Sequence, residues 1–148
     1  MDQPKQNWKR TIGIGAVIIV VLAIAIQLIP VDRTNPTIVS EPNWDSPATR
    51  ALAKDACFDC HSNETVWPWY SKIAPVSWLT WRDVEEGRDH LNFSDWDNQH
   101  VRAGEIAEVI DEGEMPPWFY VIMHPEAKLS DSEKQALIDG LLATTGQS

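Results

Sequence analysis

The chain is poor in basic residues and rich in acidic ones. Twelve lysines and arginines stand against 22 aspartates and glutamates, which gives a formal net charge of −10. The imbalance grows beyond residue 30, where nine basic side chains accompany 21 acidic ones. Nucleic acid is therefore excluded as a partner, because its phosphates would be repelled. The acidic surface suits solubility or a partner protein with a basic surface.

The chain also lacks the motifs that carry common enzyme chemistry. It has no nucleophile elbow and no phosphate-binding loop. The adjacent acids Glu85-Glu86 and Asp111-Glu112 are expected on polar helix faces, in contact with water. Strand patterns and internal repeats are missing as well. We therefore expect an all-α protein that is not an enzyme.

Cysteine is scarce, and its two copies stand three residues apart in Cys57-Phe58-Asp59-Cys60-His61. This spacing is the attachment pattern for a c-type haem. Each thiol adds across one haem vinyl group to form a thioether, and the histidine binds the iron as proximal ligand. The sequence predicts one haem c, attached through Cys57 and Cys60 and ligated by His61.

Three other interpretations of the cysteine pair fit less well. A thioredoxin-like redox pair would sit in a βαβ pattern, which the sequence lacks. A structural zinc site needs about four ligands, and the remaining three histidines are scattered. A structural disulfide would leave His61 without a role. Eight tryptophans, by contrast, suit a small domain packed around a large flat cofactor.

An apolar segment near the N-terminus predicts a membrane anchor over residues 1–30. Residues 11–29 carry no charge and would span about 28 Å as a helix, close to the hydrocarbon thickness of a bilayer. Lys5, Lys9 and Arg10 precede this span, so the N-terminus is expected in the cytoplasm and the rest outside. A cleaved signal peptide, cut after Ala25, is the alternative, but the apolar run continues to Ile29.

Beyond the anchor, residues 31–45 predict an extended linker, because Pro36 and Pro42 interrupt a polar stretch. Such a linker would let the following domain move over the membrane surface. Residues 46–148 then predict a helical domain that carries the haem. Its first helix begins at Ser46-Pro47, an N-cap followed by a favoured first residue, and leads into the cysteine motif.

Three further helices are expected in this domain. The second covers residues 75–89, with Val76, Leu79 and Val84 facing inward. The third covers residues 94–112 and ends at Gly113. A loop over residues 114–129 leads to the terminal helix, which a capping box over residues 130–133 opens.

The iron needs a sixth ligand, and Met115 is the best candidate. Pro116 and Pro117 follow it and restrict the loop, which lowers the entropy cost of holding a weak thioether ligand. Methionine in this place raises the reduction potential. Met123 is expected in the core. Ligation by a histidine remains the alternative and would lower the potential, and its candidates are His90, His100 and His124.

The chain resembles a family of small bacterial haem-binding domains, usually membrane-anchored and carrying one CxxCH motif. The resemblance covers residues 44–142, and these stretches carry it: residues 57–65, 67–70, 73–78, 86–88, 90–93 and 115–117. The family is similar to class I cytochromes c. The resemblance implies a cytochrome c-like fold, His61 as proximal ligand and Met115 as distal ligand. It also implies that a backbone carbonyl near Pro75 accepts a hydrogen bond from the ring N–H of His61.

These observations lead to three hypotheses for function. The first is a membrane-anchored electron carrier in the periplasm, because iron with six ligands leaves no open site for a substrate. The second is a redox or gas sensor in which Met115 is not bound to the iron. The third is an accessory subunit of a larger respiratory complex, with exposed tryptophans as contact points. The expected partners are the cytoplasmic membrane and a redox protein with a basic surface.

Overall fold

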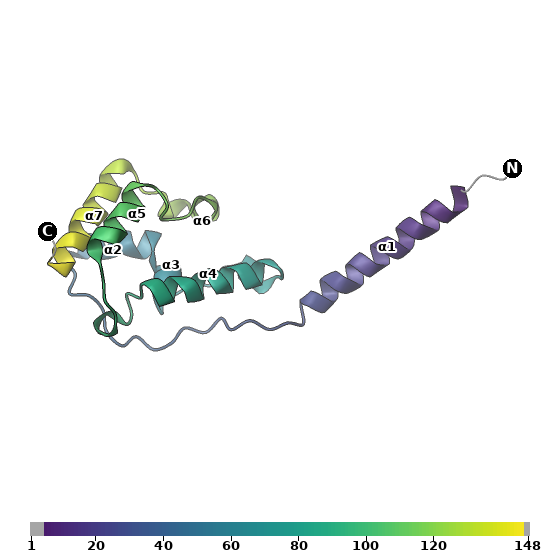
Figure 1. Ribbon diagram of the computed structural model, residues 1–148, viewed down its shortest axis with the longest axis horizontal. Helices are drawn as coiled ribbons and strands as arrows, with labels where there is room; N and C mark the ends of the chain where they lie inside the picture. The colour runs from purple at the N-terminus through teal and green to yellow at the C-terminus, as the bar shows by residue number, and fades with distance from the viewer. Residues whose placement is uncertain (1–4, 147–148) are drawn as a thin grey trace. The chain divides into compact units, whose positions relative to one another are not determined.

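The computed structural model describes residues 5–146, with side chains from residue 7 onward, and shows an all-α fold (Figure 1). The first four residues of the expected anchor and the last two of the expected haem domain lie outside the described residues. Among the described residues the only β pairing is an isolated bridge between Ser40 and Asp95. The predicted fold class is therefore confirmed. The α-helices are α1 (Lys5–Ile26), α2 (Pro47–Ala56), α3 (Phe58–His61), α4 (Val76–His90), α5 (Ala103–Asp111), α6 (Trp118–Met123) and α7 (Asp131–Thr145).

The chain forms two compact units whose boundary falls within α4. The first contains α1 and the segment Pro68–Arg82. Within α1, the stretch Asn7–Ile26 is long and apolar enough to cross a membrane. The apolar sequence run extends three residues beyond the helix, because residues 27–29 form a turn.

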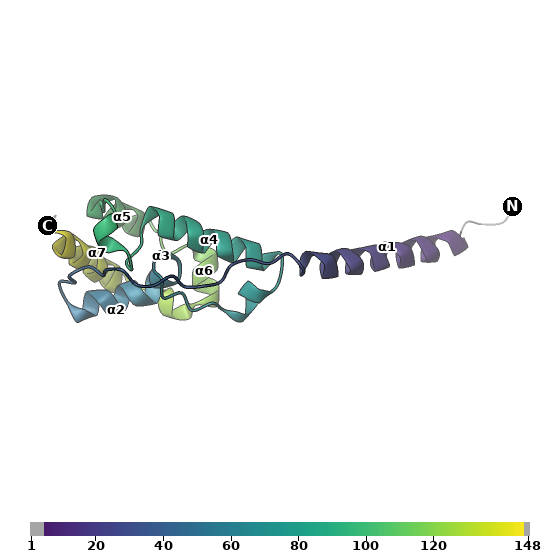
Figure 2. The same cartoon turned by 90° about the horizontal axis from the view of Figure 1, so that it is seen from below.

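The second unit comprises Thr34–Trp67 and the chain from Asp83 onward. Its helix α7 packs against α5 and α2, as both views show (Figures 1 and 2). The core between them is built on Phe58, Phe93, Ile110, Leu137 and Leu141, each at most 3% exposed. The apolar faces of these short helices are thereby removed from water, which is the main source of their stability.

Helix ends in this unit follow the sequence signals. The hydroxyl of Ser46 accepts a hydrogen bond from the N–H of Thr49 at 3.1 Å and caps α2. Ser130 and Glu133 form the predicted capping box of α7. Gly113, which follows α5, has a φ of 76°, a conformation in which only glycine is unstrained. These predictions are confirmed.

The predicted start of the third helix at Ser94 is wrong, because α5 begins only at Ala103. The buried Ser94 hydroxyl accepts a hydrogen bond from the N–H of Asn63. The backbone N–H of Ser94 donates to the side-chain oxygen of Asn92. These contacts hold residue 94 in a turn. A serine that could cap a helix instead hydrogen-bonds two loops together, one at Asn63 and one at Asn92.

The predicted linker is extended, but it is hydrogen-bonded to other segments of the second unit over most of its length, from Asn35 to Asp45. The N–H groups of Val39 and Ser40 both donate to the carbonyl of Ser94, at 2.8 and 3.2 Å. Glu41 accepts two hydrogen bonds from the Arg50 guanidinium, each 2.9 Å long. Residues 35–45 therefore form a strap on the second unit. The expected freedom of movement does not apply to this stretch, since the sequence could not show its hydrogen-bond partners.

The orientation of α4 differs in part from the prediction. Val84 is buried, as expected, whereas Val76 is 40% exposed and Leu79 is 58% exposed. Their inward orientation was predicted from helical spacing alone. Spacing identifies which side chains share a face but not which face has a partner.

Candidate functional site

The cysteine motif lies where α2 ends and the short helix α3 begins. Cys57 is the junction residue, and its carbonyl accepts hydrogen bonds from the N–H groups of Cys60 and His61 at 3.1 and 2.9 Å. The motif is thus wound into one turn that places the second cysteine and the histidine close to the first. Phe58 inside the motif is 2% exposed and anchors this turn in the core.

Cys57 and Cys60 form no disulfide with one another, and both are half-buried. Burial raises the pKa of each thiol to about 12; Cys60 adds to the effect at Cys57, and Asp59 adds to it at Cys60. A dithiol that exchanges disulfides needs a lowered thiol pKa, because the thiolate is the nucleophile. This environment therefore disfavours a thioredoxin-like role.

The ring of His61 is oriented by two backbone carbonyls. Its Nδ1 lies 2.8 Å from the oxygen of Gly87 and 3.0 Å from that of Leu91. Carbonyl oxygens only accept, so Nδ1 carries the proton and Nε2 keeps its lone pair. Burial lowers the pKa of His61 and outweighs the opposing effect of the two carbonyls. The histidine is therefore a neutral imidazole, which is the form that binds a metal.

These acceptors correct one prediction. The carbonyl that orients His61 was expected near Pro75, but the acceptors belong to the C-terminal end of α4 and the residue after it. The close approach depends on Gly87, where a Cβ atom would lie 2.5 Å from the carbonyl oxygen of Cys60. Glycine at this position was part of the sequence resemblance, but no local pattern indicated that it packs on the cysteine motif.

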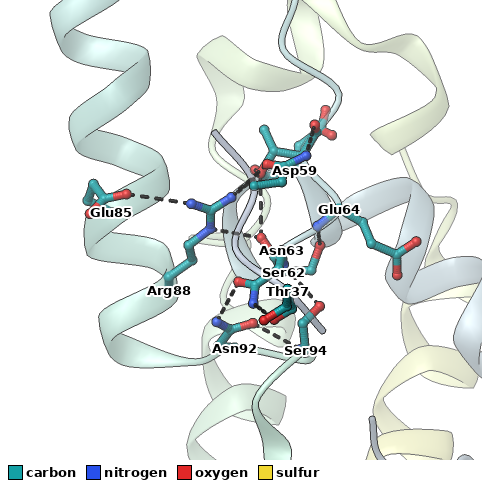
Figure 3. A network of polar contacts seen from close by, with 11 residues as sticks. Thr37, Asp59, Ser62, Asn63, Glu64, Glu85, Arg88, Asn92 and Ser94 are labelled. Carbon is teal, nitrogen blue, oxygen red and sulfur yellow. Dashed lines mark hydrogen bonds and ion pairs between the residues drawn. The ribbon is translucent and has the colours of Figure 1, made fainter. Parts of the chain in front are cut away.

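A polar network fixes the chain that follows His61 (Figure 3). Arg88 donates from Nε to the carbonyl of Ser62 at 2.9 Å and from Nη2 to the hydroxyl of Thr65 at 3.0 Å. Asn63 is 7% exposed and donates to the carbonyl of Thr37 at 2.9 Å, which joins the strap to this loop. Buried polar groups that are all paired in this way specify one conformation.

Asp59 connects the cysteine motif to α6. One of its carboxylate oxygens accepts from the N–H of Val66 at 2.9 Å, and the other accepts from the hydroxyl of Tyr120 at 2.8 Å. Burial, followed by the charge of Asp59, raises the pKa of Tyr120 above its ordinary value, so the phenol stays a donor. This contact was missed in the sequence. The only available signal was one tyrosine hydroxyl within the apolar run of residues 118–123.

Helix α6 itself corrects the prediction of a loop over residues 114–129. The chain from Met115 through α6 exposes five large apolar side chains, and the four within α6 are spaced as on one helix face. They are Met115 (39% exposed), Trp118 (74%), Phe119 (50%), Ile122 (67%) and Met123 (51%). Met123, expected in the core, thus belongs to this apolar row.

The three histidines that are the other candidates for the sixth ligand lie outside this apolar row. His90 and His100 are exposed, and His124 lies 3.1 Å from the carboxylate of Glu126 through its Nδ1. The backbone of Met115 is held at the end of α5, because its N–H donates to the carbonyl of Val109 at 3.0 Å. The structure leaves the choice of sixth ligand as a prediction.

These residues fit a haem. Two neutral thiols three residues apart match thioether formation, and His61 offers one nitrogen lone pair for iron. The Tyr120–Asp59 hydrogen bond ties α6, which carries the exposed apolar row, to the motif. Within residues 5–146, no cluster of three or more His, Cys, Asp or Glu side chains could hold a bare metal ion instead.

Comparison with known proteins agrees with this assignment. The family model described as a haem-binding domain matches residues 21–143, which is most of the chain. No curated protein and no solved structure matched the chain. The match includes the cysteine motif with His61 and the whole of α6. The chain is therefore a haem protein that belongs to the haem-binding domain family.

Proposed function

We propose that this protein is a membrane-anchored mono-haem c-type cytochrome that carries single electrons on the outer side of the cytoplasmic membrane. The observation that supports this most directly is the geometry of the motif: Cys57, Cys60 and His61 lie in one turn, and the Nδ1–H of His61 donates to the carbonyls of Gly87 and Leu91. Cys57 and Cys60 would hold the haem as thioethers and His61 would bind the iron. The bound haem would supply a one-electron iron couple.

Met115 is our proposed sixth ligand. Its thioether would favour the ferrous state, and the apolar row on α6 would keep water from the iron. With four iron positions filled by the porphyrin and two by His61 and Met115, no site would remain for a substrate, so we propose electron transfer without catalysis. A gas or redox sensor would instead need Met115 to stay off the iron or to leave it easily.

The proposed location of the haem domain on the outer side of the cytoplasmic membrane rests on α1. Its apolar stretch is long enough to cross the bilayer, and Lys9 and Arg10 lie at its N-terminal end. Positive residues at that end favour a cytoplasmic N-terminus, which puts the haem domain on the opposite side. Covalent attachment of haem c outside the membrane is consistent with this orientation.

A basic redox partner is the third part of the proposal. Glu85, Glu86 and Asp89 are exposed on the C-terminal part of α4. Such a surface steers an oppositely charged protein and speeds the encounter at low salt. The rate of electron exchange with a basic partner should therefore fall as ionic strength rises.

The first test is covalent attachment. The full chain is expressed together with a haem c maturation system, purified in detergent and extracted with acid–acetone. We expect the colour to stay with the polypeptide and the mass to increase by one haem. The double variant Cys57→Ser/Cys60→Ser should lose the colour on extraction. A wild-type chain that matures without any added mass would refute the proposal.

The second test separates an electron carrier from a sensor. Met115→Ala should abolish the methionine–iron charge-transfer band of the oxidised protein and allow the reduced protein to bind carbon monoxide. Met123→Ala is the matched control, because this methionine lies on the same apolar row. If Met123→Ala removes the band and Met115→Ala keeps it, the ligand assignment is reversed. Rapid carbon monoxide binding by the wild type would favour the sensor.

A further inference from the structure

The C-terminal end of α1 is bound to a distant segment of the first unit. The side-chain amide of Gln27 donates to the carbonyl of Ala74 at 3.0 Å and accepts from the N–H of Ala74 at 2.9 Å. Arg33 adds a hydrogen bond of 3.4 Å to the carbonyl of Ser71. Gln27 directly follows the last residue of the membrane-spanning candidate helix. Residues 71–74 are therefore held at the end of that helix.

The segment held there exposes large apolar side chains. Trp69 is 69% exposed, Ile73 48%, Val76 40% and Leu79 58%. They are three or four residues apart, and in the helical part Val76 and Leu79 share one face of α4. We call residues 69–79 the interfacial segment. An apolar row of this kind in water is costly unless another apolar phase covers it.

Several backbone groups of the interfacial segment already have hydrogen-bond partners within the first unit. Residues Trp69–Lys72 form a 3₁₀ turn, the N–H of Ile73 donates to Tyr70, and that of Ser77 donates to Ile73. Gln27 satisfies both backbone groups of Ala74. A segment can approach the hydrocarbon boundary only when its backbone groups are paired, and this segment meets that condition over these residues.

We propose that the interfacial segment lies at the membrane–water interface on the outer side of the cytoplasmic membrane. There it inserts Trp69, Ile73, Val76 and Leu79 among the lipids. The proposal rests on the proposed function in one respect, which is that α1 spans the bilayer. A span of 20 residues covers about 30 Å, so Gln27 sits at the hydrocarbon boundary when α1 crosses it. The lipid is then the apolar phase nearest to the segment.

The chemistry of the segment matches this position. Trp69 packs edge-on against Tyr70 with 5.8 Å between ring centroids, and aromatic rings with one polar end prefer the interface. The exposed Lys72 can extend its ammonium to the phosphate groups while its carbon chain stays among apolar neighbours. The segment would thus act as a second membrane contact, short and lying in the plane of the surface.

The test uses the full haem-loaded chain in phospholipid nanodiscs. A fraction of the phospholipid carries a diazirine on the upper acyl chain, and lipid adducts are mapped by mass spectrometry after irradiation. We expect adducts on peptides from both α1 and residues 69–79. Adducts on α1 with none on residues 69–79 would overturn the inference. An absence of adducts on both would refute the proposed anchoring itself, so the two failures are distinguishable.

Two variants test the physical basis. Ile73→Ser/Leu79→Ser should lower the adduct yield on the segment roughly tenfold, because it removes two of the inserted apolar side chains. Gln27→Ala should lower it while leaving the α1 adducts unchanged. Gln135→Ala is the matched control, since Gln135 donates only to Asp139 on the exposed surface of α7. An unchanged yield on residues 69–79 in both test variants would show that neither the apolar row nor the Gln27 contact places the segment in lipid.

Discussion

Replacing Gly87 by alanine tests how the side chain of His61 is held. The added Cβ would lie 2.5 Å from the carbonyl oxygen of Cys60 and 3.0 Å from its carbonyl carbon and Cβ. All three atoms belong to the rigid part of the cysteine motif, so no flexible side chain can move aside. To reach an ordinary contact of 3.4 Å, α4 must shift by about 0.9 Å.

That shift acts directly on His61. Movement away from Cys60 would stretch the 2.8 Å contact between His61 Nδ1 and the Gly87 oxygen to about 3.7 Å, which is no longer a hydrogen bond. Overpacking costs about 1–3 kcal/mol, and the lost hydrogen bond adds about 1 kcal/mol. The better helix propensity of alanine returns about 1 kcal/mol. We therefore expect a net loss of about 1–3 kcal/mol.

The measurement is thermal unfolding of the haem-loaded protein in detergent, followed by far-ultraviolet and Soret circular dichroism. The midpoint should fall by about 4–12 °C, at about 4 °C per kcal/mol for a domain of this size. The reduction potential should rise, because an imidazole that keeps only the Leu91 carbonyl as acceptor donates less charge to iron.

Gly104→Ala provides the control for this prediction. Nothing lies within 4 Å of a Cβ added at Gly104, which is also in a helix. This variant should be unchanged or more stable by up to about 1 kcal/mol. If Gly87→Ala melts like the wild type and keeps its potential, Gly87 does not set the distance between α4 and the cysteine motif.

Three further perturbations test the second unit. Ser94→Ala should cost about 1–3 kcal/mol in urea unfolding, because the buried N–H of Asn63 loses its acceptor; a cost below 0.5 kcal/mol would contradict this. Phe93→Ala, at a fully buried position, should cost about 3–5 kcal/mol in the same assay, and a smaller loss would show that the core collapses around the gap. Arg50 lowers the pKa of Glu41, so this carboxylate stabilises the fold above pH 4.5 and loses that effect as the pH falls. Glu41→Gln should therefore be less stable by about 0.5–1 kcal/mol at pH 7, with a difference that closes below pH 4.5; a constant difference would argue against the ion pair.

The sequence by itself determined the features that depend on near neighbours in the chain. The spacing of Cys57, Cys60 and His61 predicts haem attachment, and the structure winds these residues into one turn. Ser46 and Ser130 marked helix starts, because a cap bonds to an N–H only three residues away.

The tertiary structure decided the features that depend on contacts distant in sequence. The acceptors of the His61 proton are 26 and 30 residues away from it, and the partner of Asp59 is 61 residues away. The hydrogen bonds of the strap, and the choice of which side of α4 is exposed, likewise depend on residues far away in the sequence. Sequence patterns report which groups are available to bond or to be buried. Which groups actually meet depends on how the helices pack, and that is set by the three-dimensional fit of side chains from the whole chain.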